Sequence, residues 1–477
     1  MSQQYFIGID GGTQSSKVCI FDMHGHEVSE GKQTLRPLDM HQPGMAEHPE
    51  DDLWESLKLA SQQAMQSFSG EKGDIKAIGL CTIRCCRADL KADGSLAAPV
   101  LNWMDLRLAQ KYHSSSPEVA YVTSSSGYIT HRLTGEFKDS AANYEGQWPI
   151  DKRRWAWSLH PDEIERCGLT SKQLFDLVKP GEVLGHLSES AALATGFPIG
   201  LPVVATANDK AVEALGAGLG GSDTALISLG TYIGAMVPGT DKLANGKSFF
   251  TNMACVPHHY LYETGGVRYG MSTISWLKEL FGSGLIEEAQ AQTVSAEDLL
   301  NREASAIAVG SDGLITIPEW LAPTDQLFKK GIMLGFQASH RRAHLYRSAL
   351  EGIAMTMKNH LDACVGELGL DLKHLVISGG GSNSNLFMQI LADVFGLPTM
   401  RNHVTGSASL GSAMCAAVAV NAYASFAEAQ QAMVRRNDTF MPNTDNTQIY
   451  QQINQQVFSQ VTSQTDLLLE NLHSITQ

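Results

Sequence analysis

The sequence contains little cysteine and few charged residues for its length. Eight cysteines occur among 477 residues and none forms a C-x-x-C pair, which argues against a disulfide framework or a zinc ribbon. Cys81, Cys85 and Cys86 do cluster, but no further metal ligands lie near them, so buried small side chains are expected there. No apolar run is long enough to span a bilayer and no basic segment precedes the first strand, so we expect a cytoplasmic protein.

Positive charge is also scarce. The chain has 35 Lys and Arg residues against 50 Asp and Glu residues, a formal net charge of -15. This balance disfavours a surface for nucleic acid, and it means that any affinity for phosphate must be built locally. A chain of 477 residues with 43% hydrophobic residues is too long for one core. We expect two domains, residues 1–218 and 222–477, with the glycine-rich stretch Gly216–Gly221 as the hinge.

Three glycine-bearing segments carry most of the functional information: Ile7–Lys17, Ile227–Thr231 and Val376–Asn385. Each follows or ends an apolar β-branched run, which predicts a strand that enters a tight turn. Glycine in such a turn lets backbone N–H groups approach a bulky anion. A lone carboxylate, Asp209, occurs between the first and second segments. A nucleotide held by three loops with an acid nearby indicates phosphoryl transfer or nucleotide hydrolysis.

Both halves of the chain begin with a strand, a turn and a second strand, and then continue as alternating strands and helices. This pattern is a weak internal repeat and favours two related α/β domains that face each other across a cleft. The apolar runs predict buried strands at Ile75–Leu80 and Val203–Thr206 and a helix at Ala343–Leu361. The tail predicts an amphipathic helix from four apolar residues spaced four apart: Ile449, Ile453, Val457 and Val461.

The chain resembles the FGGY carbohydrate kinases from about residue 5 to about residue 430. The resemblance rests on motifs in a fixed order: D-G-G-T at Asp10–Thr13, W-M-D-L-R at Trp103–Arg107, H-R-L-T-G at His131–Gly135, N-D-K-A-V-E-A-L-G-A-G at Asn208–Gly218, S-L-G-T at Ser228–Thr231, L-E-G-I-A at Leu350–Ala354 and G-G-G-S-N-S-N at Gly379–Asn385. It implies an α/β fold of two ribonuclease H-like (actin-like ATPase) domains across a central cleft. It also implies ATP and Mg²⁺ as cofactors and a small sugar or polyol as acceptor.

The resemblance implies that Asp209 is the catalytic base that accepts the proton of the acceptor hydroxyl. It also implies that Asp10 holds Mg²⁺, through water, together with Asp209. The sequence alone leaves a structural alternative for each residue. Asp209 precedes a helical stretch and is placed to be its N-cap, and Asp10 is placed to cap the following turn.

Nucleotide contacts are implied for all three glycine-bearing segments. In the first, Lys17 provides a point charge for a terminal phosphate, with a solvated strand-edge lysine as the alternative. One departure from the family pattern is Gly406, which stands where many members have Glu. The predicted nucleotide-binding residues are Gly12, Thr13, Ser15, Ser16 and Lys17 in the first segment, Gly230 and Thr231 in the second, and Gly380, Gly381 and Asn385 in the third.

The acceptor site is predicted to include Arg84, Trp103, Asp105 and Asp209. Arg84 matches an acceptor-contacting Arg of glycerol kinases, but Cys85 stands where those enzymes have Glu. A buried structural ion pair is the alternative for Arg84 and for Asp105. A ketopentose such as xylulose or ribulose is the first expectation for the acceptor, and glycerol or another polyol the second.

Two other classes of function remain open from the sequence. One is a nucleotide switch like actin or Hsp70, which the sugar-kinase motifs at Trp103–Arg107 and His131–Gly135 disfavour. The other is a degenerate kinase that acts as a sugar-responsive regulator, which the presence of both Asp10 and Asp209 disfavours. The sequence predicts no nucleic-acid or membrane partner and leaves the oligomeric state open, with a homodimer as one option.

Overall fold

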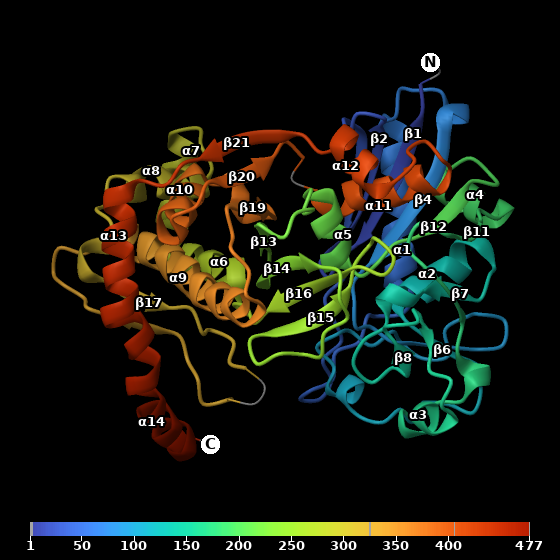
Figure 1. Ribbon diagram of the computed structural model, residues 1–477, viewed down its shortest axis with the longest axis horizontal. Coiled ribbons are helices and arrows are strands. Elements are labelled where there is room, and N and C mark those ends of the chain that lie inside the picture. The colour runs from blue at the N-terminus through green and yellow to red at the C-terminus, as the bar shows by residue number, and fades with distance from the viewer. Residues whose placement is uncertain (1–2, 324–325, 405, 477) are drawn as a thin grey trace.

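Two mixed β-sheets, one from each half of the chain, organise the structure (Figure 1). The computed structural model describes residues 3–323, 326–404 and 406–476. The first sheet has the strand order β11-β12-β4-β1-β2-β3. Its strands are β1 (Tyr5–Gly11), β2 (Ser15–Asp22), β3 (Glu27–Thr34), β4 (Ile75–Thr82), β11 (Val183–His186) and β12 (Pro202–Ala205).

The second sheet has the order β15-β16-β14-β13-β19-β20-β21 and repeats the pattern of the first. In each sheet two strands form an antiparallel hairpin, β1–β2 or β13–β14. On its other side the first strand of the hairpin pairs with a parallel strand, which is followed across the sheet by a second parallel strand and an antiparallel edge strand. The internal repeat expected from the sequence is therefore confirmed. The strands are β13 (Thr224–Leu229), β14 (Ile233–Gly239), β15 (Phe249–Met253), β16 (Tyr260–Thr264), β19 (His374–Ser378), β20 (Thr399–Asn402) and β21 (Arg436–Phe440).

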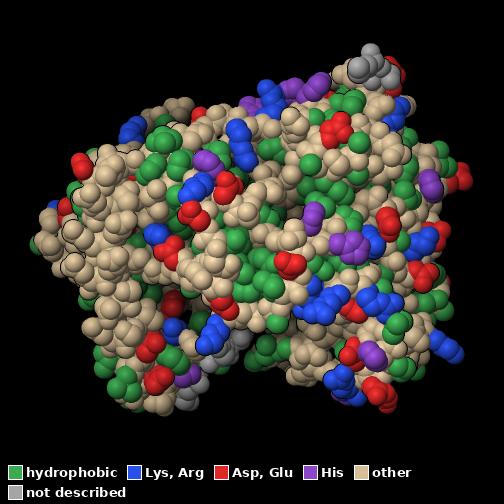
Figure 2. Space-filling model, viewed as in Figure 1, with side chains coloured by type: hydrophobic (Ala, Val, Ile, Leu, Met, Phe, Trp, Pro, Cys, Tyr) green, Lys and Arg blue, Asp and Glu red, His purple; other side chains and the backbone are tan. Residues whose placement is uncertain are grey.

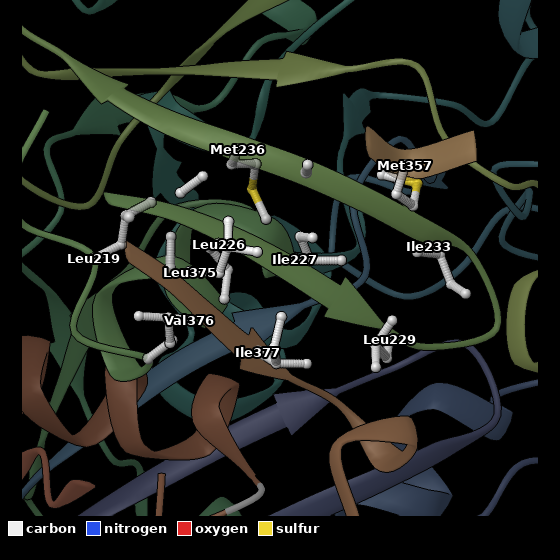
Figure 3. Packing of buried hydrophobic residues seen from close by; sticks show 14 of the residues in the cluster. Leu219, Leu226, Ile227, Leu229, Ile233, Met236, Met357, Leu375, Val376 and Ile377 are labelled. Atoms are coloured by element: carbon white, nitrogen blue, oxygen red, sulfur yellow. The ribbon is translucent and has the colours of Figure 1, made fainter. Parts of the chain in front are cut away.

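Apolar strands form the centre of each sheet. Along β1 the side chains alternate between two cores: Phe6 faces one, while Tyr5, Ile7 and Ile9 face the other. In the second sheet, Figure 3 shows the side chains of β13 beside those of β19 and β14. Burial on both faces explains why these strands read as continuous apolar runs.

Helices cover both sheets. On the first sheet, α1 (Asp52–Ser67), α2 (Ser125–Thr134) and α4 (Glu189–Thr195) lie on one face. On the second sheet, the long helix α9 (Arg342–Leu368) contacts β14 and β16. The remaining helices are α3 (Pro161–Arg166), α5 (Asp209–Gly216), α6 (Gly270–Phe281), α7 (Ser283–Ala291), α8 (Ala296–Ser305), α10 (Asn385–Phe395), α11 (Ser407–Ala419), α12 (Phe426–Met433), α13 (Thr444–Ile453) and α14 (Ser459–Thr476).

Short strands form small two-stranded sheets at the periphery. They pair β5 (Ala88–Leu90) with β6 (Tyr121–Thr123), β7 (Lys138–Ser140) with β10 (Asp176–Val178), β8 (Ile150–Asp151) with β9 (Ala156–Trp157), and β17 (Ile315–Ile317) with β18 (Ile332–Leu334). Among the helices of the described ranges, none combines the length and apolar composition needed to cross a bilayer.

Helix α11 belongs to the second half of the chain but lies on the first sheet, against β1, β4 and α5. Glycines make this close approach feasible. A Cβ on Gly8 would lie 1.8 Å from the Ser409 carbonyl oxygen, and one on Gly79 would lie 1.9 Å from that of Ser412. Gly216, expected in the hinge, is held against α11 in the same way, whereas Gly218 has a positive φ of 76°. The domain boundary expected between residues 218 and 222 stays a prediction. The helices α11 and α12 come after this boundary in the sequence but cross back to the first sheet.

Helix α5 has two different faces. Ala211, Ala214 and Leu215 line an apolar groove of about 960 Å³, together with residues of β14, β16 and α12. Figure 2 shows hydrophobic side chains near the centre of the face of the molecule that is turned to the viewer. Lys210 and Glu213 do not line the groove. The polar face of α5 is therefore free to form part of a site elsewhere.

The C-terminal tail differs from the expected amphipathic helix. Ile449 and Val457 are exposed, whereas Tyr450, Phe458 and Val461 are buried. A strict spacing of four residues drifts from the 3.6-residue period of an α-helix, so the four apolar residues do not all stay on the buried face. A π-helical turn, Asn454–Phe458, also interrupts the regular helix between α13 and α14.

Candidate active site

Asp10 and Asp209 lie at the same edge of the first sheet. Asp10 is near the end of β1, and Asp209 opens α5 just after β12. Because β1 and β12 both run parallel to β4, their carboxyl ends reach the same side. Burial, reinforced by Asp209 and Glu213, raises the pKa of Asp10 to about 7. Burial also raises the pKa of Asp209. The two carboxylates thus share one partly enclosed, negatively charged site.

Asp209 is not the cap of its helix. Asn208 is the N-cap, and its side chain accepts a hydrogen bond from Ala211 N at 3.1 Å. Asp209 Oδ1 is buried and has no hydrogen-bond partner among the described residues. The guanidinium of Arg84 lies nearby, with Nε 3.8 Å from Asp209 Oδ1. A buried carboxylate oxygen left unpaired is costly, so it is suited to accept a hydrogen bond from a ligand hydroxyl.

These carboxylates also fit a magnesium ion. Asp10 and Asp209 bring hard oxygen ligands to one edge of the sheet. Burial raises the pKa of both carboxyl groups, and the Asp209 carboxylate raises the pKa of Asp10 further. Such a pair is stabilised by a divalent cation, and Mg²⁺ binds through one or two carboxylates plus water and phosphate oxygens.

The first two glycine-bearing turns meet each other. In the first, Gly12 N donates to Ser15 O at 3.0 Å and closes the turn around Thr13. Gln14 Nε2 then donates to Thr231 Oγ1 at 3.3 Å, across from the second turn. Thr231 follows Gly230 at the end of β13 and is exposed. The structure therefore brings the two predicted phosphate-binding turns side by side.

Two residues predicted for phosphate binding point elsewhere. Ser16 is buried, and its hydroxyl lies 2.8 Å from that of Ser56 on α1. Lys17 forms an ion pair with Glu30, at 2.7 Å between Nζ and Oε2, and lies 3.6 Å from Glu27. Glu30 pairs with Cys19 in the β2–β3 register, farther from the turn than Lys17. The ammonium group of Lys17 is therefore drawn along the hairpin and away from the turn.

A different lysine, missed from the sequence, lies beside the carboxylates. Lys210 Nζ donates to Ser228 Oγ at 2.7 Å and to Glu213 Oε2 at 3.0 Å. Ser228 Oγ in turn donates to Glu213 Oε2 at 2.8 Å, which closes a triangle. Burial acts to lower the pKa of Lys210, but the Glu213 and Asp209 carboxylates outweigh it and hold that pKa above its usual value. The sequence did offer a sign that Lys210 belongs to the site, since Lys210 directly follows Asp209.

The third glycine-bearing segment forms a turn between β19 and α10. Gly379 has φ 84°, a left-handed conformation that glycine adopts readily. Gly380 is exposed with open space around its Cα, while a Cβ on Gly381 would meet Leu229 of β13. Asn385 is exposed at the start of α10. Gly380 and Asn385 are thus accessible to a ligand, and Gly381 fixes the turn against the second sheet.

The predicted acceptor residue Arg84 forms an ion pair that joins the two halves of the chain. Its Nη1 and Nη2 donate to the two carboxylate oxygens of Glu263 at 2.7 and 2.8 Å. Asn252 Nδ2 also donates to Glu263, at 2.7 Å, and Asn252 Oδ1 is buried without a partner in the described ranges. Glu145 lies close by and accepts from Asn208 at 3.3 Å. Glu263 was missed, although a lone Glu within the apolar strand β16 was a visible signal.

Asp105 has the structural role that the sequence left open as its alternative. Arg107 donates to its carboxylate through Nε at 2.9 Å and Nη2 at 2.6 Å, and Ala46 N donates at 2.8 Å. With its side chain fully buried, Asp105 has no oxygen left for an acceptor. Trp103 is half-buried and contacts the core of the first sheet.

The cysteines near Arg84 differ in their exposure. Cys81 and Cys86 are buried, as expected, but Cys85 is exposed and has φ 59°. Within the described ranges, the one group of three or more His, Cys, Asp or Glu side chains whose ligand atoms lie close enough to share a metal ion is Cys19, Glu27 and Glu30. The Lys17 ammonium already contacts both carboxylates of that group.

Comparison with known proteins gives the family. Residues 5–120 match the N-terminal domain, and residues 225–420 the C-terminal domain, of the FGGY family of carbohydrate kinases. A curated relative, the "Uncharacterized sugar kinase YgcE" of Escherichia coli (strain K12), is 49% identical over 475 residues, which cover 100% of this chain and 96% of the relative.

The chain belongs to the FGGY family of carbohydrate kinases.

Solved structures of FGGY kinases show the same fold. The xylulose kinase from Rhodospirillum rubrum aligns with a TM-score of 0.80 at 23% identity, covering 98% of this chain and all (100%) of that one. The gluconate kinase from Lactobacillus acidophilus aligns with a TM-score of 0.83 at 18% identity, covering 99% and 100%. The predicted fold of two actin-like domains and the predicted class of enzyme, a carbohydrate kinase, are therefore confirmed.

Proposed function

We propose that this FGGY kinase transfers the terminal phosphoryl group of ATP to a hydroxyl of a small neutral sugar or polyol, first of all a ketopentose such as xylulose or ribulose. The single observation that carries the proposal is the Asp209 Oδ1, unpartnered among the described residues, which lies beside Arg84 at the edge of the sheet where β1 leads into the first glycine-bearing turn. A base at this position lies within reach of both an acceptor hydroxyl and a nucleotide phosphate.

The charge around Arg84 favours a neutral acceptor. Three carboxylates, those of Asp209, Glu145 and Glu263, raise the pKa of Arg84, and two bonds of its guanidinium are used by Glu263. An anionic acceptor would therefore meet net negative charge. Asp209 Oδ1 and Asn252 Oδ1 are unpaired acceptors, and the O–H groups of a sugar or polyol are matching donors.

The proposed reaction needs little covalent chemistry from the protein. Asp209 positions the acceptor hydroxyl and takes its proton as the hydroxyl oxygen bonds to the phosphorus. The turns around Thr13 and Thr231 hold the phosphates, and the exposed Gly380 and Asn385 offer a surface for adenosine. Mg²⁺, held by Asp10 and Asp209, would neutralise phosphate charge. The free cysteines support placing this reaction in the reducing cytoplasm.

An acceptor screen tests the proposal. ADP release is measured with ATP and Mg²⁺ against xylulose, ribulose, glycerol and longer polyols, with gluconate as the anionic control. We expect turnover with at least one neutral acceptor and much less with gluconate. Turnover with gluconate alone would contradict the neutral acceptor. Nucleotide binding without transfer to any acceptor would favour a degenerate, regulatory kinase.

A further inference from the structure

Phosphoryl transfer requires positive charge near the terminal phosphate, and the structure offers two lysines close to the turns. Lys17 is on the first turn's own hairpin, but Glu30 and Glu27 hold its ammonium group. Both acids lie on β3, which is paired with β2 throughout the hairpin. Lys17 is therefore neutralised within the first sheet before any nucleotide is present.

Lys210 is placed differently. It lies in the first turn of α5, one residue after Asp209, and its Nζ reaches Ser228 of β13 at 2.7 Å. Ser228 precedes Gly230 and Thr231 by two and three residues, so Lys210 links α5 to the strand that leads into the second phosphate turn. Its side chain retains 14% exposure. A lysine ammonium has three N–H donors, and Glu213 and Ser228 use two of them in the described structure.

The charges around Lys210 also favour a role for this residue in binding an anion. Asp10, Asp209 and Glu213 gather at this edge, and Lys210 is the cation in direct hydrogen-bond contact with one of them. A triphosphate entering between the two turns would meet these carboxylates. A cation that stays in place, with one free N–H, lowers that repulsion.

We propose that Lys210, rather than Lys17, is the residue that binds the terminal phosphate of the nucleotide, and that Lys17 is a structural residue of the first hairpin. The proposal rests on the proposed function and names a further phosphate-binding residue for it. Glu213 and Ser228 are positioning residues, because they hold the ammonium group between the two turns.

The competing interpretation is that Lys210 only ties α5 to β13. Binding of two nucleotides distinguishes the interpretations, since ADP lacks the terminal phosphate that a non-hydrolysable ATP analogue carries. If Lys210 only ties α5 to β13, its replacement should weaken the binding of both nucleotides and lower the melting temperature. If Lys210 contacts the terminal phosphate, its replacement should weaken the binding of the ATP analogue alone.

The test measures ADP and AMP-PNP binding by titration calorimetry, with Mg²⁺, in the full-length protein. The main variant is Lys210→Gln, which keeps a donor for Glu213 and Ser228 and removes the charge. Lys17→Gln is the matched control. We expect Lys210→Gln to weaken AMP-PNP by about 10- to 150-fold, the range for a charge-assisted hydrogen bond, and ADP by less than about threefold. Lys17→Gln should leave the ratio of the two affinities unchanged.

Several outcomes would overturn the proposal. One is equal weakening of both nucleotides in Lys210→Gln, and another is selective loss of AMP-PNP affinity in Lys17→Gln. Ser228→Ala provides a second variant, which retains Lys210 and should reduce the preference for AMP-PNP less than Lys210→Gln does. If the wild-type protein phosphorylates a sugar and Lys210→Gln keeps its AMP-PNP affinity, the Lys210 assignment alone fails. If the wild-type protein binds neither nucleotide, the proposed function fails with it.

Discussion

Arg84 and Glu263 lie 179 residues apart in the sequence and form a two-pronged ion pair across the two halves of the chain. Glu263 is fully buried, and Arg84 keeps only 18% of its side-chain exposure. The pair is next to Asp209, with Arg84 Nε 3.8 Å from Asp209 Oδ1. Contact between the halves and the geometry of the proposed acceptor site are therefore established by the same side chains.

Loss of either partner should destabilise the protein. Arg84→Met leaves the Glu263 carboxylate buried without its counter-charge, and breaking a buried pair in this way costs about 3–5 kcal/mol of unfolding free energy. The double variant Arg84→Met/Glu263→Leu should recover most of that loss in urea unfolding and still bind the acceptor poorly. A single variant of wild-type stability with a raised acceptor KM would show that the pair is not needed for folding.

Asp209→Asn should remove the proposed base while retaining the shape of the side chain. We expect sugar-dependent turnover to fall by at least about 100-fold, the lower range for a lost general base, with ATP affinity near that of wild type. Asp105→Asn is a useful comparison, since Asp105 is committed to Arg107 and should affect stability before catalysis. Retention of more than half the wild-type turnover in Asp209→Asn would contradict the assignment.

The two halves should approach each other when both substrates bind. Asp10 and Asp209 belong to the first half and Thr231 and Gly380 to the second, so the complete site needs both. Small-angle scattering should show a smaller radius of gyration with AMP-PNP plus acceptor than without ligands. Glu263→Gln should weaken this closure. Identical scattering in all ligand states would contradict it.

Stability should fall in mild acid because of His48. This residue is buried, and burial lowers its pKa to about 4. Its unfolded form has the ordinary pKa of about 6.5, so the unfolded state takes up the proton first as pH falls. The loss begins below about pH 6.5 and is complete below about pH 4, and should reach roughly 2 kcal/mol by pH 5. Urea midpoints at pH 7 and pH 5 measure it, with His48→Gln as the control.

His48→Gln should show a smaller drop between the two pH values than wild type, because Gln does not titrate. Asn102 Nδ2 lies 3.1 Å from His48 Nε2, so Gln retains a polar partner at this position. An equal drop in both proteins would assign the acid sensitivity to other groups.

The sequence predicted the features that depend on local pattern. Asp10 and Asp209 each follow an apolar strand, and parallel neighbours of one strand must bring their carboxyl ends together. The duplicated α/β fold followed from the repeated strand–turn–strand openings.

The sequence did not predict which distant side chains pair with one another. Lys17 was interpreted as a free cation because nothing in its own segment shows that β3 brings Glu27 and Glu30 beside it. Glu263 could not be matched to Arg84 for the same reason. The π-turn at Asn454–Phe458 was missed because a four-residue spacing assumes unbroken α-helix.

The placement of α11 has a consequence for biosynthesis. The first sheet is made early, yet the helix that covers one of its faces is encoded after residue 406, and that face carries Gly8 and Gly79 together with the apolar side chain of Phe6. While the ribosome is still translating the second half, this surface of the nascent chain stays uncovered. The first half therefore cannot complete folding as an independent unit during synthesis, and a gene fragment that stops before α11 should yield an aggregating product.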